Sequence, residues 1–215
     1  MFAGHVGAAF AIARAERRVP LGAFVVAALL LDIVLWAFVL AGVEAVTLPA
    51  DFADKHQAAF EFPWSHGLAA ALAWSAAAGL VARRRGVRAA LWVAAAVFSH
   101  WPLDALVHRP ELPLVGATSP HVGLALWDRL PLALAVEAAL LAGGLALYLH
   151  GSTLPRARRL ALALLAALLL AFTVAGMTLA PAPPSAATMA AGSLLTIAAA
   201  CALFGWIAGD RRTTR

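Results

Sequence analysis

Cysteine and charged residues are both scarce in this sequence. A single cysteine, Cys201, among 215 residues excludes a disulfide framework and a cysteine-based zinc motif. Charged residues make up only 13% of the chain and hydrophobic residues 63%, whereas soluble domains average roughly 25% and 45–50%. The composition therefore excludes an ordinary soluble domain and indicates an integral membrane protein.

Apolar runs that are long enough to cross a bilayer recur along the chain. A spanning α-helix needs about 20 predominantly apolar residues. The sequence predicts six spans, over residues 21–43, 65–82, 88–107, 122–149, 159–180 and 186–208. Residues 1–13 are apolar but too short to span, which predicts a half-inserted or interfacial helix. We expect an all-α transmembrane bundle that forms one domain over residues 1–215, without the internal repeats of many transporters.

Arginine clusters predict the orientation of the bundle. Short loops rich in Lys and Arg stay on the cytoplasmic side of a membrane. The arginines behind the net charge of +5 gather in four clusters, at residues 14–18, 83–88, 156–159 and 211–215. All four fall on the same side of the predicted spans, whereas Lys55 and Arg109 fall on the other. Both termini are therefore expected in the cytoplasm, and the basic charge needs no nucleic-acid partner to explain it.

Ionisable side chains also occur inside the predicted spans and in the apolar N-terminal segment, where His5 reaches the same depth if residues 1–13 enter the membrane. Counted at about 1.5 Å per residue from the arginine-rich ends, they share one depth near the middle of the membrane. These residues are His5, Asp32, His66, His100, Asp104 and Glu137. Such residues usually mark a functional site, although interhelical hydrogen bonds are an alternative, and Glu137 could pair with Arg129 on its own helix.

The stretch SHWPLDALVH at residues 99–108 is the richest in such groups. His100, Asp104 and His108 are spaced four apart, so they share one face of a helix. Pro102 lacks a backbone N–H and predicts a kink one turn before it. Imidazole and carboxylate ligands without cysteine suit zinc, with manganese or non-haem iron as alternatives. A water activated by such a metal is the natural nucleophile.

Four short motifs follow one another in an order found in a known family of membrane proteins. They are GHVGAAF with His5, LLLDIV with Asp32, WSHGL with His66, and SHWPLD with His100 and Asp104. This order resembles the YdjM-like family of inner-membrane, metal-dependent hydrolases. The resemblance covers the first half of the chain. It implies a location in a bacterial inner membrane and a metal site formed by these five residues.

Two positions depart from the family pattern. Where the family has a Pro-Asp-x-Asp run, this chain has Leu31, Asp32, Ile33 and Val34, so the second acid is missing. Where a His-Arg-Gly-x-Thr-His run would begin, the chain has Glu61. A glutamate at that position could still ligate a metal.

The leading functional hypothesis is a metal-dependent hydrolase that acts on a lipid-linked ester, phosphoester or amide. Its expected partners are membrane lipid and a lipid-like substrate, and Glu137 or His108 would act as the acid or base. One alternative is a small permease or proton-coupled transporter, in which the buried carboxylates and imidazoles relay protons. Another is a non-enzymatic membrane partner protein whose polar groups hold its helices together.

Overall fold

The chain folds almost entirely into helices. A computed structural model describes residues 1–209. Its α-helices are α1 (Phe2–Ala15), α2 (Leu21–Ala28), α3 (Leu30–Leu40), α4 (Phe52–Lys55), α5 (Leu68–Ala82), α6 (Val87–Phe98), α7 (His100–Val107), α8 (Leu130–His150), α9 (Arg156–Thr178) and α10 (Ala186–Ala208). Two 3-10 turns, η1 (Arg83–Arg85) and η2 (Leu126–Arg129), precede α6 and α8. Two antiparallel strand pairs complete the described residues, β1 (Ala45–Thr47) with β2 (Ala59–Glu61), and β3 (Leu112–Pro113) with β4 (His121–Val122).

Several helices have the length and composition of membrane spans. Within residues 1–209, four segments qualify, Val87–Val107, Leu126–His150, Arg156–Thr178 and Ala186–Ala208, and the bent pair of α2 and α3 makes a fifth if it counts as one span. These helices agree with an integral membrane protein. The predicted number of six spans is not confirmed. The predicted span that does not qualify is the one over residues 65–82, because its helix α5 has 15 residues and a typical span requires about 20.

Two of the predicted helices are interrupted close to their ionisable residues Asp32 and His100. The helix expected over residues 21–43 breaks at Leu29, where α2 and α3 meet at an angle of 53°. The helix expected over residues 88–107 breaks at Ser99, between α6 and α7. Pro102 predicts this second break because it cannot donate a hydrogen bond to the preceding turn. The first break lies where the sequence has neither proline nor glycine.

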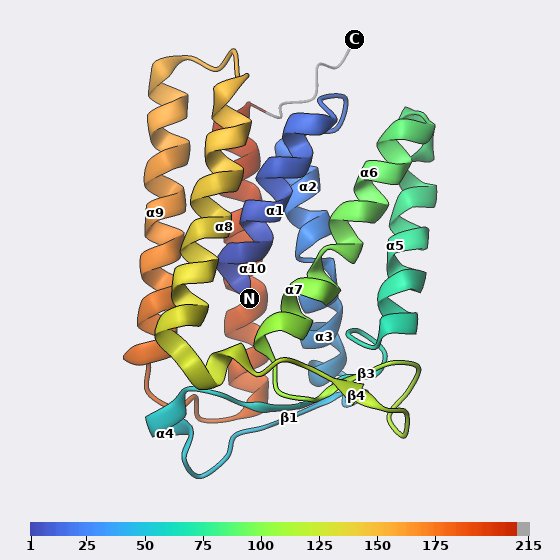
Figure 1. Ribbon diagram of the computed structural model, residues 1–215, viewed down its shortest axis with the longest axis vertical. Coiled ribbons are helices and arrows are strands. Elements are labelled where there is room, and N and C mark those ends of the chain that lie inside the picture. Colours follow the sequence, from blue (N-terminus) through green and yellow to red (C-terminus); the bar gives the residue numbers. More distant parts are fainter. Residues whose placement is uncertain (210–215) are drawn as a thin grey trace.

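Helix α1 is enclosed by the bundle. It lies beside α8 and α2, its Phe10 ring packs against Phe204 of α10, and the N-terminus is halfway along the length of the spans (Figure 1). His5, Val6 and Phe10 are fully buried, so the interfacial alternative is wrong, because an interfacial helix keeps one face in water or headgroups. Two glycines allow this packing. A Cβ at Gly7 would overlap the backbone of Leu140, and one at Gly144 would overlap the backbone of Gly7.

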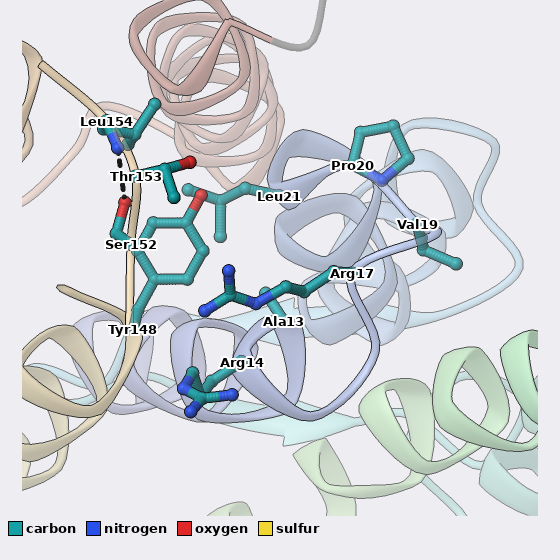
Figure 2. Close-up of a pocket in the computed structure, with 10 residues that line it drawn as sticks. All are labelled: Ala13, Arg14, Arg17, Val19, Pro20, Leu21, Tyr148, Ser152, Thr153 and Leu154. Atoms are coloured by element: carbon teal, nitrogen blue, oxygen red, sulfur yellow. Dashed lines mark hydrogen bonds between the residues drawn. The ribbon is translucent and has the colours of Figure 1, made fainter. Parts of the chain in front are cut away.

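The two ends of the bundle differ in composition. The turns after α1, α5 and α8, which carry arginines or adjoin them, lie at one end, and both strand pairs lie at the other (Figure 1). The fourth arginine cluster, residues 211–215, lies outside the described residues. A cavity of about 170 Å³ lies at the arginine-rich end. Figure 2 shows the residues that line it, with the Arg17 side chain extending toward Tyr148. Arg17 also donates to the carbonyl of Gly151. Charge and shape thus give the bundle two distinct ends.

Candidate metal centre

Five ionisable side chains form a buried cluster, those of His5, Asp32, His66, His100 and Asp104. Two residues of α7 lie at its centre. His100 and Asp104 are one turn apart on its buried face, and His100 Nε2 lies 3.0 Å from Asp104 Oδ2. Their exposed fractions are 0% and 1%. Because side chains four residues apart share one face of a helix, the local sequence alone brings this imidazole and this carboxylate together.

Helix α1 adds His5 to this pair. His5 Nε2 lies 3.0 Å from Asp104 Oδ1. The His5 and His100 rings are stacked, with their centroids 3.6 Å apart and their planes 12° from parallel. The backbone amine of Met1 also lies 3.2 Å from Asp104 Oδ1. The buried position of α1 therefore places the Met1 amine and the His5 imidazole against α7.

Asp32 and His66 complete the cluster from two other segments. His66 precedes α5, and its Nε2 lies 3.2 Å from His100 Nε2 and 3.4 Å from Asp104 Oδ2. Asp32, in the first turn of α3, places Oδ1 at 3.6 Å from Nε2 of both His66 and His100. The structure thus brings together all five residues that the sequence analysis named as metal ligands.

Two of the imidazoles are oriented by hydrogen bonds on the side away from the cluster. His100 Nδ1 lies 2.7 Å from the carbonyl oxygen of Ala28, next to the break between α2 and α3. His66 Nδ1 lies 2.8 Å from the hydroxyl of Ser65. Metal-binding histidines typically use one ring nitrogen for such a partner, which fixes the ring and directs the other nitrogen at the ion. Both rings have that arrangement here.

The geometry of the donor atoms fits a small divalent ion. Two groups of three residues, His5, His100 and Asp104, and Asp32, His66 and His100, have donor atoms within 4.8 Å of one another. Zn–N bonds of 2.0–2.1 Å in a tetrahedron put neighbouring ligand atoms about 3.3 Å apart. The separations that join Asp32, His66, His100 and Asp104 range from 3.0 to 3.6 Å. The cluster could therefore hold a metal ion.

Glu137 lies beside the cluster but faces the start of α1. Its Oε2 accepts hydrogen bonds from the backbone N–H groups of Ala3 at 2.9 Å and Gly4 at 3.3 Å. The anticipated pairing with Arg129 is wrong, because the carboxylate of Glu137 bonds to unpaired N–H groups at the N-terminus of α1. A carboxylate there is also favoured by the helix dipole. Glu137 therefore fixes the position of the helix that carries His5.

His108 lies one turn beyond Asp104, at the edge of the cluster. Its Nε2 is 3.9 Å from Asp104 Oδ2, and its Nδ1 is 2.6 Å from Glu111 Oε1. Its ring packs against Trp127, with centroids 4.2 Å apart. The sequence analysis did not identify Glu111, although its spacing of three residues from His108 was a usable signal.

Two other glutamates differ in their relation to the site. Glu44, which the sequence analysis left unassigned, is 5% exposed and accepts hydrogen bonds from the backbone N–H groups of Trp64 and Ser65, each at 2.8 Å. It thereby holds the turn that presents His66. Glu61, considered as a replacement ligand, is an exposed residue of β2 and belongs to neither candidate metal group.

A cavity of about 550 Å³ opens from the cluster. Its polar end is lined by Asp32, His66, Asp104, His108 and Glu137. The rest of its wall comes from the start of α1, from α3, α9, α10 and the turn that joins the last two, and from aromatic residues of the strand-bearing loops. A substrate held in this cavity would meet the carboxylates and imidazoles at one end.

No family model, curated protein or solved structure matches this chain.

Proposed function

We propose that this protein is a membrane-embedded, metal-dependent hydrolase that acts on a lipid or a lipid-linked substrate. The observation that carries the proposal is the buried cluster of two carboxylates and three imidazoles, whose donor atoms have the separations of a metal site. Nitrogen and oxygen donors without thiolate suit zinc best, with manganese and iron as alternatives. The order of the motifs, which resembles that of the YdjM-like family, supports the same activity.

The charges of the cluster favour a bound cation. Asp32 and Asp104 face imidazoles, and Asp104 also meets the amine of Met1. A buried carboxylate is costly unless it is paired with a positive charge and hydrogen-bonded. The amine of Met1 supplies such a charge to Asp104, and a divalent ion held by Asp32 and the imidazoles would supply it to Asp32.

The residues of the site would have different roles in hydrolysis. When bound, a divalent ion polarises a carbonyl or phosphoryl oxygen and makes water a stronger nucleophile at neutral pH. The Ala28 carbonyl and the Ser65 hydroxyl keep His100 and His66 directed at the centre. His108 lines the cavity, with Glu111 at its other nitrogen, and would give a proton to the leaving group. Glu137 would act by holding α1 rather than by transferring a proton.

The proposal includes an orientation in the membrane. Both termini and the arginine-rich turns would be cytoplasmic, with α2 and α3 as one bent span and α5 as the sixth. The strand pairs and the mouth of the large cavity would then face the outer leaflet of a bacterial inner membrane. The positive-inside rule supports this orientation through the arginines that adjoin α1, α5 and α8.

A proton-coupled transporter is the second candidate. Contacts between titratable groups run from Glu111 through His108 and Asp104 to His100, and such a chain could pass protons. The two candidates differ in the expected requirement for metal, because a proton relay of this kind functions without one.

Metal content and stability of an Asp104→Asn variant separate the candidates. Asparagine keeps the size and hydrogen-bonding capacity of Asp104 but removes an anionic ligand, so metal affinity should fall by roughly tenfold or more. Elemental analysis of the detergent-purified protein should find a transition metal in the parent and in Asp54→Asn, a control at an exposed position. Chelator should lower the melting temperature of the parent to that of Asp104→Asn, because an ion that binds the folded state stabilises it. A parent without metal that ignores chelator would overturn the hydrolase proposal in favour of the relay.

A further inference from the structure

We infer that the large cavity holds one acyl chain of a membrane lipid, which enters sideways between α9 and α10 and places its headgroup linkage at the His/Asp cluster. The inference rests on the proposed function and deepens it, because it names the part of the substrate that is bound and its route of entry. The occupant is a bilayer lipid rather than a water-soluble molecule.

The size and the two ends of the cavity suit an amphiphile. Its volume of about 550 Å³ lies within the roughly 300–1,000 Å³ of sites for small molecules. Asp32, Asp104 and His66 line one end. Apolar side chains such as Met177 of α9 and Ile197 of α10 line other parts of its wall. A molecule that fills this space needs a polar group at one end and a hydrocarbon chain at the other.

Two of the hydroxyls on the walls of α9 and α10 already bond within their own helices. The Thr173 hydroxyl donates to the carbonyl of Leu169, and the Thr196 hydroxyl donates to the carbonyl of Gly192, each at 2.9 Å. These hydroxyls therefore present little unmet hydrogen-bonding capacity to the cavity. A hydrocarbon chain can lie against these two threonines at no cost in lost hydrogen bonds.

The cavity opens through the sides of two candidate membrane spans. Phe172 and Gly176 of α9, and Thr188 and Gly192 of α10, line the cavity and are also exposed on the surface of the chain. These residues belong to the halves of α9 and α10 next to their connecting turn, opposite the arginine-rich end (Figure 1). An opening in the side of a membrane span faces the lipid bilayer. The molecules that can enter it from there are lipids, whose acyl chains fill one leaflet at this depth.

Two glycines keep this opening wide. A Cβ placed on Gly176 or Gly192 would meet no atom within 4 Å. The Cβ of a leucine at either position would therefore lie in open space, and we expect the rest of its side chain to extend into the opening. Gly143 of α8 offers a matched control, because a Cβ there also meets nothing within 4 Å, yet this residue is not part of the cavity wall.

The test compares Gly176→Leu, Gly192→Leu and Gly143→Leu in nanodiscs of phosphatidylethanolamine and phosphatidylglycerol. The probe is phosphatidylglycerol with a photoreactive diazirine in its acyl chain. Mass spectrometry should locate its crosslinks on the cavity-lining residues of α9 and α10 in the parent and in Gly143→Leu. Either leucine in the opening should abolish those crosslinks while melting temperature and metal content stay at the parent values.

The metal readout keeps the two proposals separable. Crosslinks that are spread over the outer faces of α8, α9 and α10, and that survive in Gly176→Leu and Gly192→Leu, would overturn the acyl-chain site even if metal is bound. Crosslinks confined to the cavity wall of a parent that lacks metal would support the acyl-chain site and overturn the metal-dependent activity.

Discussion

The imidazoles of the cluster differ in what holds their second nitrogen. His100 is fixed by a backbone carbonyl and His66 by the hydroxyl of its neighbour Ser65. His5 Nδ1 is buried and has no hydrogen-bond partner among the described residues. Its ring is held instead by stacking on His100. His5 is thus the ligand whose orientation depends most on the placement of a whole helix.

Removal of the Ser65 hydroxyl should weaken metal binding more than folding. In Ser65→Ala, His66 loses the partner of its Nδ1, and changes of this kind typically cost roughly 10–100-fold in metal affinity. The free energy of unfolding should fall by only about 1 kcal/mol, the usual net contribution of one hydrogen bond. Competition with a fluorescent zinc chelator gives the affinity. Ser99→Ala is the matched control, since the Ser99 hydroxyl bonds to Ala96 outside the cluster, and an equal loss in both variants would contradict this role of Ser65.

Replacement of Glu137 tests whether it positions α1 or transfers a proton. In Glu137→Gln, the hydrogen bonds to the amides of Ala3 and Gly4 lose their charge, so the metal-free protein should lose about 1–3 kcal/mol of stability. Thermal unfolding in detergent with excess chelator measures this loss, and Glu61→Gln on the exposed strand β2 should show none. Unchanged stability in Glu137→Gln would return this residue to the list of proton donors.

The members of the candidate site could be chosen from the sequence because ionisable groups are expensive inside an apolar span. That argument selects His5, Asp32 and His100 without any knowledge of the helix packing. It does not reach Glu44, because this residue lies in a loop and acts on backbone N–H groups of a distant turn. The partners of Glu137 were unpredictable for the same reason, since they depend on how α1 docks.

At the level of helices, the contact between α1 and α8 decides whether the cluster is complete. Gly7 and Gly144 let the two backbones touch, as small residues do in many membrane bundles. Glu137 and Gly144 lie on the same buried face of α8. One face of α8 therefore fixes both the lateral position and the N-terminal end of α1.

A methyl group at this crossing should separate the two helices. Gly144→Ala places a Cβ against the backbone of Gly7, and overpacking of this kind typically costs about 1–3 kcal/mol. We expect a lower melting temperature and a lower metal content, because His5 moves away from Asp104. Gly143→Ala adds a methyl group at the adjacent residue, where it points into open space, and this variant should behave like the parent. Equal behaviour of the two variants would show that the crossing tolerates separation.

The lengths of apolar runs predicted most helix positions but not all the breaks. Pro102 in α7 predicted the interruption at Ser99. Leu29 lies in a run of aliphatic residues in which no proline or glycine predicts a break. At this break the Ala28 carbonyl bonds to His100 of another helix. A pattern of hydrophobicity reports which residues avoid water, and it carries no information about a bond from another helix.

At the scale of the whole molecule, the separation of arginines from strand pairs predicts the sidedness of the protein. Cys201 is the sole cysteine, so a Cys201→Ala background allows single cysteines to report topology. A membrane-impermeant maleimide applied to intact cells should label Thr118→Cys, between β3 and β4, and leave Thr153→Cys, between α8 and α9, unlabelled until the cells are lysed. Labelling in the reverse order would invert the proposed orientation.

The enclosure of α1 also has a consequence for how the protein is made. Translation produces α1 before any other helix of this sequence, yet its neighbours α8 and α10 are among the last to emerge. A nascent chain that ends after α7 contains Asp32, His66 and His100 but offers α1 neither Glu137 nor the surface at Gly144. Helix α1 therefore gains its main packing surface only after α8 has been made, later than the segments that carry the other four residues of the cluster.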